Sequence, residues 1–289
     1  MWHYLKFILK QDDCLINIIN IADTCINLGH WLSYFKCSSM VVIPKPNKLV
    51  YDQPKSFQSI VLLNTLDKLI EKVVTKKLQF LITKNDFIHL SQLGSLKFKS
   101  TTDTGVALTH IIRSGWVKNK TTSTLAFDIA QFFPSLNHCL FTLILEKVGL
   151  DSKVVSFFAD YLIGRKTNYT WNDIFSLIFK VNISVGQGST LSSILSALYL
   201  SPFLYIIEKR LKNLNIHIYI ISQNKSIDIS NSHLFCSYNV LTKLLDKFGL
   251  IIEHSKTETF HFNRLYGFFN SPLLDLSTIR DPTLCLKDL

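Results

Sequence analysis

The chain has 289 residues, which suits one large domain or two small ones with a packed core. A hydrophobic content of 47% excludes a generally disordered chain, and six scattered cysteines without a Cys-x-x-Cys pair argue against a disulfide framework or a zinc site. Lysines and arginines outnumber acidic residues by 31 to 21, and this net charge of +10 favours an anionic partner such as nucleic acid.

The N-terminal residues 1–38 are expected to form a helical extension. Apolar residues between positions 15 and 26 recur at helical spacing. No secretory signal is evident, because Asp12 and Asp13 soon follow the apolar start. The cysteine usage fits a reducing, intracellular compartment, with nucleus and cytoplasm both open.

A short strand is expected at 41–43, followed by a rigid basic turn at 44–48 with two prolines. Lys45 and Lys48 are candidates for phosphate contacts, although a solvated loop would have the same composition.

Residues 64–81 are expected to form an amphipathic helix. Asn64 is suited to the N-cap, and apolar residues repeat at helical spacing behind it. The lysines of this segment lie mostly off the apolar stripe, where they would be solvated.

A turn-rich basic segment follows at 91–100, before a helix that begins at Thr101 or Thr102. Lys97 and Lys99 flank an aromatic residue there, and this combination suits a nucleic-acid track.

Residues 125–138 combine a short strand with a helix start. Apolar residues alternate from 125 to 129, Pro134 stops the pairing, and Ser135 or Asn137 can cap a helix. Asp128 is the one carboxylate of this segment. It could place a metal against a nucleotide, or it could be an aspartate at a surface turn.

Two helices are expected next, at 137–148 and from 151 to about 164, and then a strand at 177–185. The glycine turn at 186–189 feeds a helix at 191–211. It is not a P-loop, because no Gly-Lys-Ser/Thr follows. Close approach to a substrate and a tight strand-to-helix turn both explain its glycines.

The uncharged stretch 181–207 is long enough to span a bilayer, but its polar first half and Pro202 argue against a membrane helix. Beyond it, a strand is expected at 216–222, a helix from Ser230 or Asn231 to Gly249, and a hairpin formed by 250–253 and 257–262.

Taken together, these segments resemble the reverse transcriptase domain of LINE-type (non-LTR) retrotransposons, most closely fungal ones. The resemblance runs from about residue 39 to residue 264, with its motifs in the family's order. The matching segments are 42–48, 54–64, 91–101, 126–135, 186–192 and 248–257.

The resemblance implies an α/β (α+β) fold with the right-hand arrangement of polymerases. Fingers would span 39–120, and a palm with a small antiparallel sheet backed by helices would span 121–264. The thumb would be missing or truncated, and 265–289 would form an irregular tail.

The resemblance also implies template-directed nucleotide transfer with two magnesium ions. Asp128 would supply a catalytic metal ligand, and Phe133 would lie beneath the incoming sugar. Gln187 and Gly188 would line the nucleotide and template pocket, and Lys256 would lie near the triphosphate. The implied partners are an RNA template or an RNA–DNA hybrid and a deoxynucleoside triphosphate, with Lys45, Lys48, Lys97 and Lys99 on the nucleic acid.

One family motif is missing. The second catalytic motif, an aromatic residue, any residue and then Asp-Asp, should precede 222–226, yet residues 216–221 contain no aspartate. The interval is also short for two strands and a turn. Asp228, the next acid, matches the family's following helix. In the fingers, Gln58 and Ser59 replace the usual Arg-Pro.

A lone carboxylate does not hold two close magnesium ions against their mutual repulsion. The sequence therefore predicts a degenerate polymerase domain with impaired magnesium binding and little or no nucleotide transfer. A non-catalytic module that binds RNA or an RNA–DNA hybrid, a non-functional translated relic and a membrane protein are the alternatives.

Overall fold

The structure is a computed structural model that describes residues 10–94, 96–171, 174–211, 220–264 and 267–269. Helices and sheets are mixed, as the predicted α/β class requires. Contacts divide the chain into two compact units, each built from two stretches of sequence. Unit 1 comprises Met1–Ile88 and Phe133–Tyr199, and unit 2 comprises His89–Phe132 and Leu200–Leu289. The division into fingers and palm stays a prediction.

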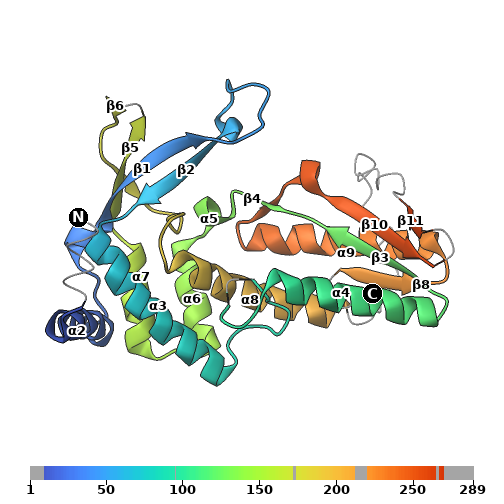
Figure 1. Cartoon of the computed structure of the whole chain (residues 1–289), viewed down its shortest axis with the longest axis horizontal. Helices are drawn as coiled ribbons and strands as arrows, with labels where there is room; N and C mark the ends of the chain where they lie inside the picture. The colour runs from blue at the N-terminus through green and yellow to red at the C-terminus, as the bar shows by residue number, and fades with distance from the viewer. Residues whose placement is uncertain (1–9, 95, 172–173, 212–219, 265–266, 270–289) are drawn as a thin grey trace. The chain divides into compact units, whose positions relative to one another are not determined.

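Unit 1 contains a five-stranded sheet of order β2-β1-β5-β6, in which β7 also pairs with β5 (Figure 1). β1 runs antiparallel to β2 and parallel to β5. The strand predicted at 41–43 is confirmed as part of β1. The strands are β1 (Cys37–Pro44), β2 (Phe57–Leu62), β5 (Arg165–Trp171), β6 (Ile174–Phe175) and β7 (Phe179–Val181).

The helices that follow local capping signals form where the sequence predicts them. Asn64 accepts a hydrogen bond from the Leu66 amide at 3.0 Å at the start of α3. Asn137 and Asp151 cap α6 and α7 in the same way. Unit 1 has α2 (Asp12–Leu28), η1 (Ser33–Lys36), η2 (Pro54–Ser56), α3 (Thr65–Asn85), α6 (His138–Val148) and α7 (Ser152–Leu162), while α5 (Phe132–Ser135) and α8 (Ser192–Leu211) contain residues of both units.

The strand predicted at 177–185 is wrong in extent, because only Phe179–Val181 is extended and paired. The polar segment Arg165–Trp171 shows little apolar alternation. It nevertheless forms β5, which pairs with β1, β6 and β7. Sheet pairing has overridden the weak local signal here.

Unit 2 contains an antiparallel sheet of order β11-β10-β3-β8 and a separate short pair, β4 with β9. Figure 1 shows α4 and α9 running along this sheet. The elements are α4 (Thr101–Val117), β3 (Thr121–Ala126), β4 (Ile129–Ala130), β8 (Ile221–Asn224), α9 (Ile227–Lys247), β9 (Ile251–Ile252), η4 (His254–Lys256), β10 (Glu258–Asn263) and β11 (Gly267–Phe269).

Both faces of β3 are covered. Residues 121–125 are buried one after another, as expected of a central strand packed on two sides. On the face of Thr122, the Gln223 side chain donates to the Ile111 carbonyl of α4 at 2.7 Å. On the opposite face, Asn224 reaches Ser230 of α9.

Two predicted boundaries and one predicted strand pairing in unit 2 need correction. The strand expected at 125–129 lies at Thr121–Ala126, and Asp128 falls in the turn behind it. The expected C-terminal hairpin is absent from the described residues, because β9 pairs with β4 and β10 pairs with β3. α9 begins at Ile227, since Ser226 caps it through the Asp228 amide.

Most of the strand predicted at 216–222 lies outside the described residues, and β8 begins at Ile221. No helix in the described ranges has the length and apolarity needed to cross a membrane.

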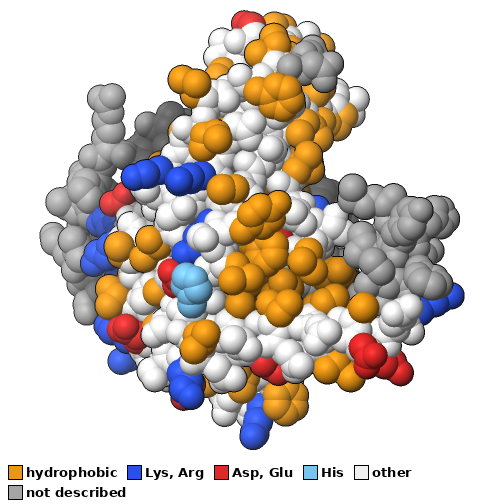
Figure 2. All heavy atoms as spheres, turned by 90° about the vertical axis from the view of Figure 1, so that its left-hand side faces the viewer, with side chains coloured by type: hydrophobic (Ala, Val, Ile, Leu, Met, Phe, Trp, Pro, Cys, Tyr) orange, Lys and Arg blue, Asp and Glu red, His pale blue; other side chains and the backbone are white. Residues whose placement is uncertain are grey.

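Exposed apolar side chains gather on the face of the molecule that Figure 2 shows, and Lys and Arg side chains lie mainly around its margin. The positive charge of the chain is therefore not concentrated on this face.

Candidate functional site

Asp128 lies in the turn between β3 and β4 of unit 2. Its carbonyl accepts a hydrogen bond from the Glu253 amide at 2.8 Å, beside the β4–β9 pair. The turn η4 follows β9 and brings Lys256 to the same place. The Lys256 Nζ atom lies 2.6 Å from the Asp128 Oδ2 atom, with the two side chains 63% and 51% exposed. The structure thus joins two predicted site residues that are far apart in the sequence.

Lys256 lies between the charges of two acids, Asp128 and the nearby Glu253, and of these two only Asp128 pairs with it directly. The hydrogen bond with Asp128, together with the charge of Asp128, raises the pKa of Lys256. Lys256 therefore stays protonated at neutral pH, and its ammonium group covers a carboxylate oxygen that a metal ion would need.

The described residues contain no group of three or more His, Cys, Asp or Glu side chains that could hold a metal ion. The pairing of β8 with β3 ends where the Leu125 amide donates to the Ile220 carbonyl. Residues 212–219, which precede it, are outside the described ranges and contain neither aspartate nor glutamate.

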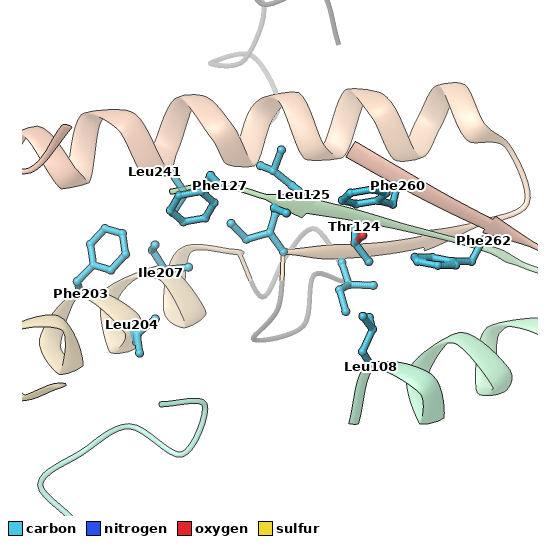
Figure 3. Close-up of a pocket in the computed structure, with 13 residues that line it drawn as sticks. Leu108, Thr124, Leu125, Phe127, Phe203, Leu204, Ile207, Leu241, Phe260 and Phe262 are labelled. Carbon is cyan, nitrogen blue, oxygen red and sulfur yellow. The ribbon is translucent and has the colours of Figure 1, made fainter. Parts of the chain in front are cut away.

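An apolar cavity of about 580 Å³ lies beside the end of β3 that leads to Asp128 (Figure 3). Phe127, Phe260 and Leu241 are among its lining residues, and Thr124 is the polar one among those that the structure describes. The described lining residues carry no charge, which does not suit the phosphates of a nucleoside triphosphate.

The glycine turn of unit 1 approaches β2 rather than open solvent. The Val61 amide donates to the Gln187 carbonyl at 2.7 Å. Gly188 has φ +122°, and a Cβ atom there would lie 2.5 Å from the Val61 carbonyl oxygen. The Val185 amide donates to the Phe133 carbonyl at 3.1 Å, which places Phe133 at the base of the same loop. The sequence allows the glycine turn to approach a substrate closely. In this structure the backbone of the turn instead lies against β2 of the same unit.

Two buried acids of α3 were not predicted as site residues from the sequence. Asp67 and Glu71 are both 0% exposed, and they belong to the buried stripe of the helix with Ile70, Val74 and Leu78. Acids spaced four apart within an apolar stripe are the signal that could have identified them. Glu71 accepts hydrogen bonds from Ser189 and Thr190 of the glycine turn.

Burial raises the pKa of Asp67 to about 7, and the nearby charge of Glu71 adds to the rise, whereas Arg165 and Lys68 oppose it. Neither carboxyl oxygen of Asp67 has a hydrogen-bond partner among the residues that the structure describes. The protonated form of Asp67 is therefore favoured below neutral pH.

We expect the free energy of unfolding of the wild type to fall as the pH rises, because Asp67 must lose its proton while buried. In Asp67→Asn this fall should be absent. The folded pKa of about 7 exceeds the ordinary value of 3.8, so the folded state keeps a proton that the unfolded state has lost in this window. The variant should gain roughly 1–4 kcal/mol in free energy of unfolding, relative to the wild type, between about pH 4 and pH 8. Urea unfolding at several pH values measures this, with the exposed Asp246→Asn as the control. A difference that does not change with pH would contradict it.

The four candidate lysines differ in their surroundings. Lys48 and Lys97 are exposed, and the Lys97 Nζ atom lies 4.8 Å from the centre of the Phe98 ring. Lys99 is half-buried and donates to the Gln92 carbonyl at 3.3 Å, so it braces its own loop. Lys45 is also half-buried, in the turn that follows β1.

Comparison with known families decides the class of the protein. The family model described as reverse transcriptase (RNA-dependent DNA polymerase) matches residues 43–279. The chain belongs to the reverse transcriptase family. A search of curated proteins finds no match.

Solved structures similar to this reverse transcriptase chain include telomerases, at 14% identity, which supports the fold alone. Apo telomerase of Candida tropicalis, truncated from its C-terminal domain, has a TM-score of 0.54 over 82% of this chain. Telomerases of Candida tropicalis and Candida albicans in complex with a fragment of telomeric RNA give 0.55 and 0.54, over 84% and 81% of this chain. The alignment spans 55% of the first telomerase chain and 43% of the other two.

Reverse transcriptases generally use magnesium, which prefers several hard oxygen ligands. The described residues around Asp128 do not fit paired magnesium ions, because one carboxylate faces an ammonium group and no acidic cluster surrounds it. The roles expected for Asp128, Phe133, Gln187, Gly188 and Lys256 stay predictions.

Proposed function

We propose that the chain is a degenerate reverse transcriptase domain of a LINE-type (non-LTR) retrotransposon, which binds an RNA template or an RNA–DNA hybrid with little or no nucleotide transfer. The observation that carries the proposal is the ion pair of Asp128 with Lys256 at 2.6 Å. The sequence between α8 and β8 supports it, because residues 212–220 contain no acid.

The physical argument is one of charge. Two divalent cations about 4 Å apart repel one another strongly, and several protein carboxylates must offset this repulsion. Substrate phosphates supply some of the metal ligands, but the protein must supply the carboxylates that complete the coordination. Asp128, whose carboxylate is ion-paired with Lys256, supplies too little negative charge to offset the repulsion between the two cations.

Binding of nucleic acid does not need those carboxylates. A net charge of +10 and exposed lysines in both units suit the phosphate backbone. The RNA complexes of the structurally similar telomerases are consistent with an RNA partner. We therefore infer that holding a template or a hybrid is the property that persists.

We expect the protein to bind a fluorescein-labelled RNA–DNA hybrid with an affinity that falls as salt rises, because lysines release counterions from phosphates. The double variant Lys48→Glu/Lys97→Glu should weaken binding and flatten the salt slope by about 1 for each phosphate that is no longer neutralised. Fluorescence anisotropy over a salt series measures both quantities.

The matched control is Lys153→Glu/Lys243→Glu, which makes the same change of charge at two exposed lysines outside the candidate segments. Affinity that is absent at low salt, or that does not depend on salt, would contradict the proposed function and favour an inert relic.

A further inference from the structure

Glu71 holds the glycine turn by hydrogen bonds from several directions. Its Oε2 atom accepts from the Ser189 hydroxyl at 2.8 Å, from the Thr190 amide at 2.9 Å and from the Thr190 hydroxyl at 3.2 Å. Its Oε1 atom accepts from the Tyr161 hydroxyl at 2.5 Å. The carboxylate is 0% exposed, so water does not substitute for these donors.

Hydrogen bonds, and not an ion pair, stabilise the buried carboxylate of Glu71. No ion pair among the described residues includes Glu71. The guanidinium of Arg165 lies over the Tyr161 ring, 4.7 Å from its centre, and Asp67 contributes a second acid nearby. A buried carboxylate is costly unless its oxygens are well satisfied, and here three of the four donors belong to the loop.

The other side of the same loop is fixed by β2. The Val61 amide donates to the Gln187 carbonyl, and the Val61 carbonyl oxygen leaves no room for a side chain on Gly188. Residues 186–190 are therefore held between the backbone of β2 and a side chain of α3, with Gln187 and Gly188 at the middle of the loop.

We infer that Glu71 is the positioning residue of the loop 186–190, and that it sets the loop conformation in which Gln187 and Gly188 meet the template and its paired nucleotide. The second half of this inference rests on the proposed function. Ser189 connects Glu71 to the segment that enters α8, because its hydroxyl donates to Glu71 and accepts from the amide of Leu191, the residue just before the helix. Glu71 acts through the loop and is not itself a catalytic residue.

Three variants separate positioning from packing. Glu71→Met fills a similar volume but leaves the Thr190 amide without its acceptor, whereas Glu71→Gln keeps a carbonyl oxygen that can accept from the loop. Tyr161→Phe removes a donor to the same carboxylate, together with a 3.1 Å contact to the Ser189 hydroxyl, while the contacts of Thr190 with Glu71 stay in place. Hydrogen–deuterium exchange of the loop amides reports its conformation without any ligand. Anisotropy with an RNA–DNA hybrid carrying a single-stranded RNA template overhang reports binding.

We expect Glu71→Met to speed amide exchange in the loop about tenfold or more and to weaken hybrid binding about tenfold, because a buried amide loses its partner. Glu71→Gln should stay within about twofold of the wild type in both measurements, since its carbonyl oxygen takes over. Tyr161→Phe should lower the melting temperature while hybrid affinity stays within about twofold.

Wild-type exchange in the loop of Glu71→Met would overturn the inference, as would faster exchange with unchanged hybrid affinity. If Glu71→Met does not fold, Ser189→Ala removes one donor of the same contact, and unchanged loop exchange in that variant overturns the inference equally. A wild type that binds no hybrid would overturn the proposed function, while the exchange data would still decide whether Glu71 holds the loop.

Discussion

Gly188→Ala is expected to lower the free energy of unfolding by roughly 3 kcal/mol, through a clash and an unfavourable backbone conformation. The added Cβ atom would lie 2.5 Å from the Val61 carbonyl oxygen, a backbone atom that cannot rotate away. The residue also has φ +122°, which alanine rarely adopts. Urea unfolding followed by circular dichroism measures the change.

Gly149→Ala is the matched control. Gly149 also has a positive φ, +89°, at the end of α6, but apart from its neighbours in the chain no described atom lies within 4 Å of the position of an added Cβ. Its cost should be about 1 kcal/mol, from backbone strain alone. Equal costs at the two positions would show that the contact with Val61 is not tight and would contradict this account of the loop.

Helices with local capping signals could be predicted from the sequence. α3 begins behind Asn64 and α6 behind Asn137, because in each case the cap side chain accepts from a backbone amide of the first turn. α4 begins at Thr101, one of the two predicted starts, with Ser100 and Asp103 forming a capping box. These contacts lie within one turn of helix, so a short stretch of sequence contains the whole signal.

Strands whose burial depends on distant partners could not be predicted. Residues 121–124 are three threonines and a serine, and a polar run of this kind does not indicate a central strand. They are buried because β10 and β8 pair on either side and α4 and α9 cover the faces. The buried Ser123 hydroxyl is 2.6 Å from the Nδ1 atom of His261, so its polarity is satisfied inside the unit.

The candidate site could be predicted only in part. Asp128 and Lys256 were both predicted as site residues, but the direct contact between them depends on the placement of η4 beside the turn after β3. Glu71 lies within a helix that the sequence does predict. Its contact with Thr190 depends on packing between segments that are remote in the chain, so the sequence offered only an acid in an apolar stripe.

Deoxynucleotide incorporation is expected to stay at background with Mg²⁺ and with Mn²⁺, and Asp128→Ala should leave it unchanged. Divalent cations supply several kcal/mol of transition-state stabilisation, so a site that does not hold them should be slower by roughly 10³-fold or more. Asp128 forms an ion pair with Lys256, and among the described residues no cluster of metal ligands surrounds it. Primer extension measures this directly.

The decisive measurement is extension of a labelled DNA primer on a homopolymer RNA template by the wild type and by Asp128→Ala, each with Mg²⁺ and then with Mn²⁺. An active reverse transcriptase serves as the positive control, and hybrid binding by both proteins is checked in parallel. We predict that neither protein extends the primer above the level without enzyme, although both bind the hybrid. Template-dependent extension by the wild type that is abolished in Asp128→Ala would contradict the account.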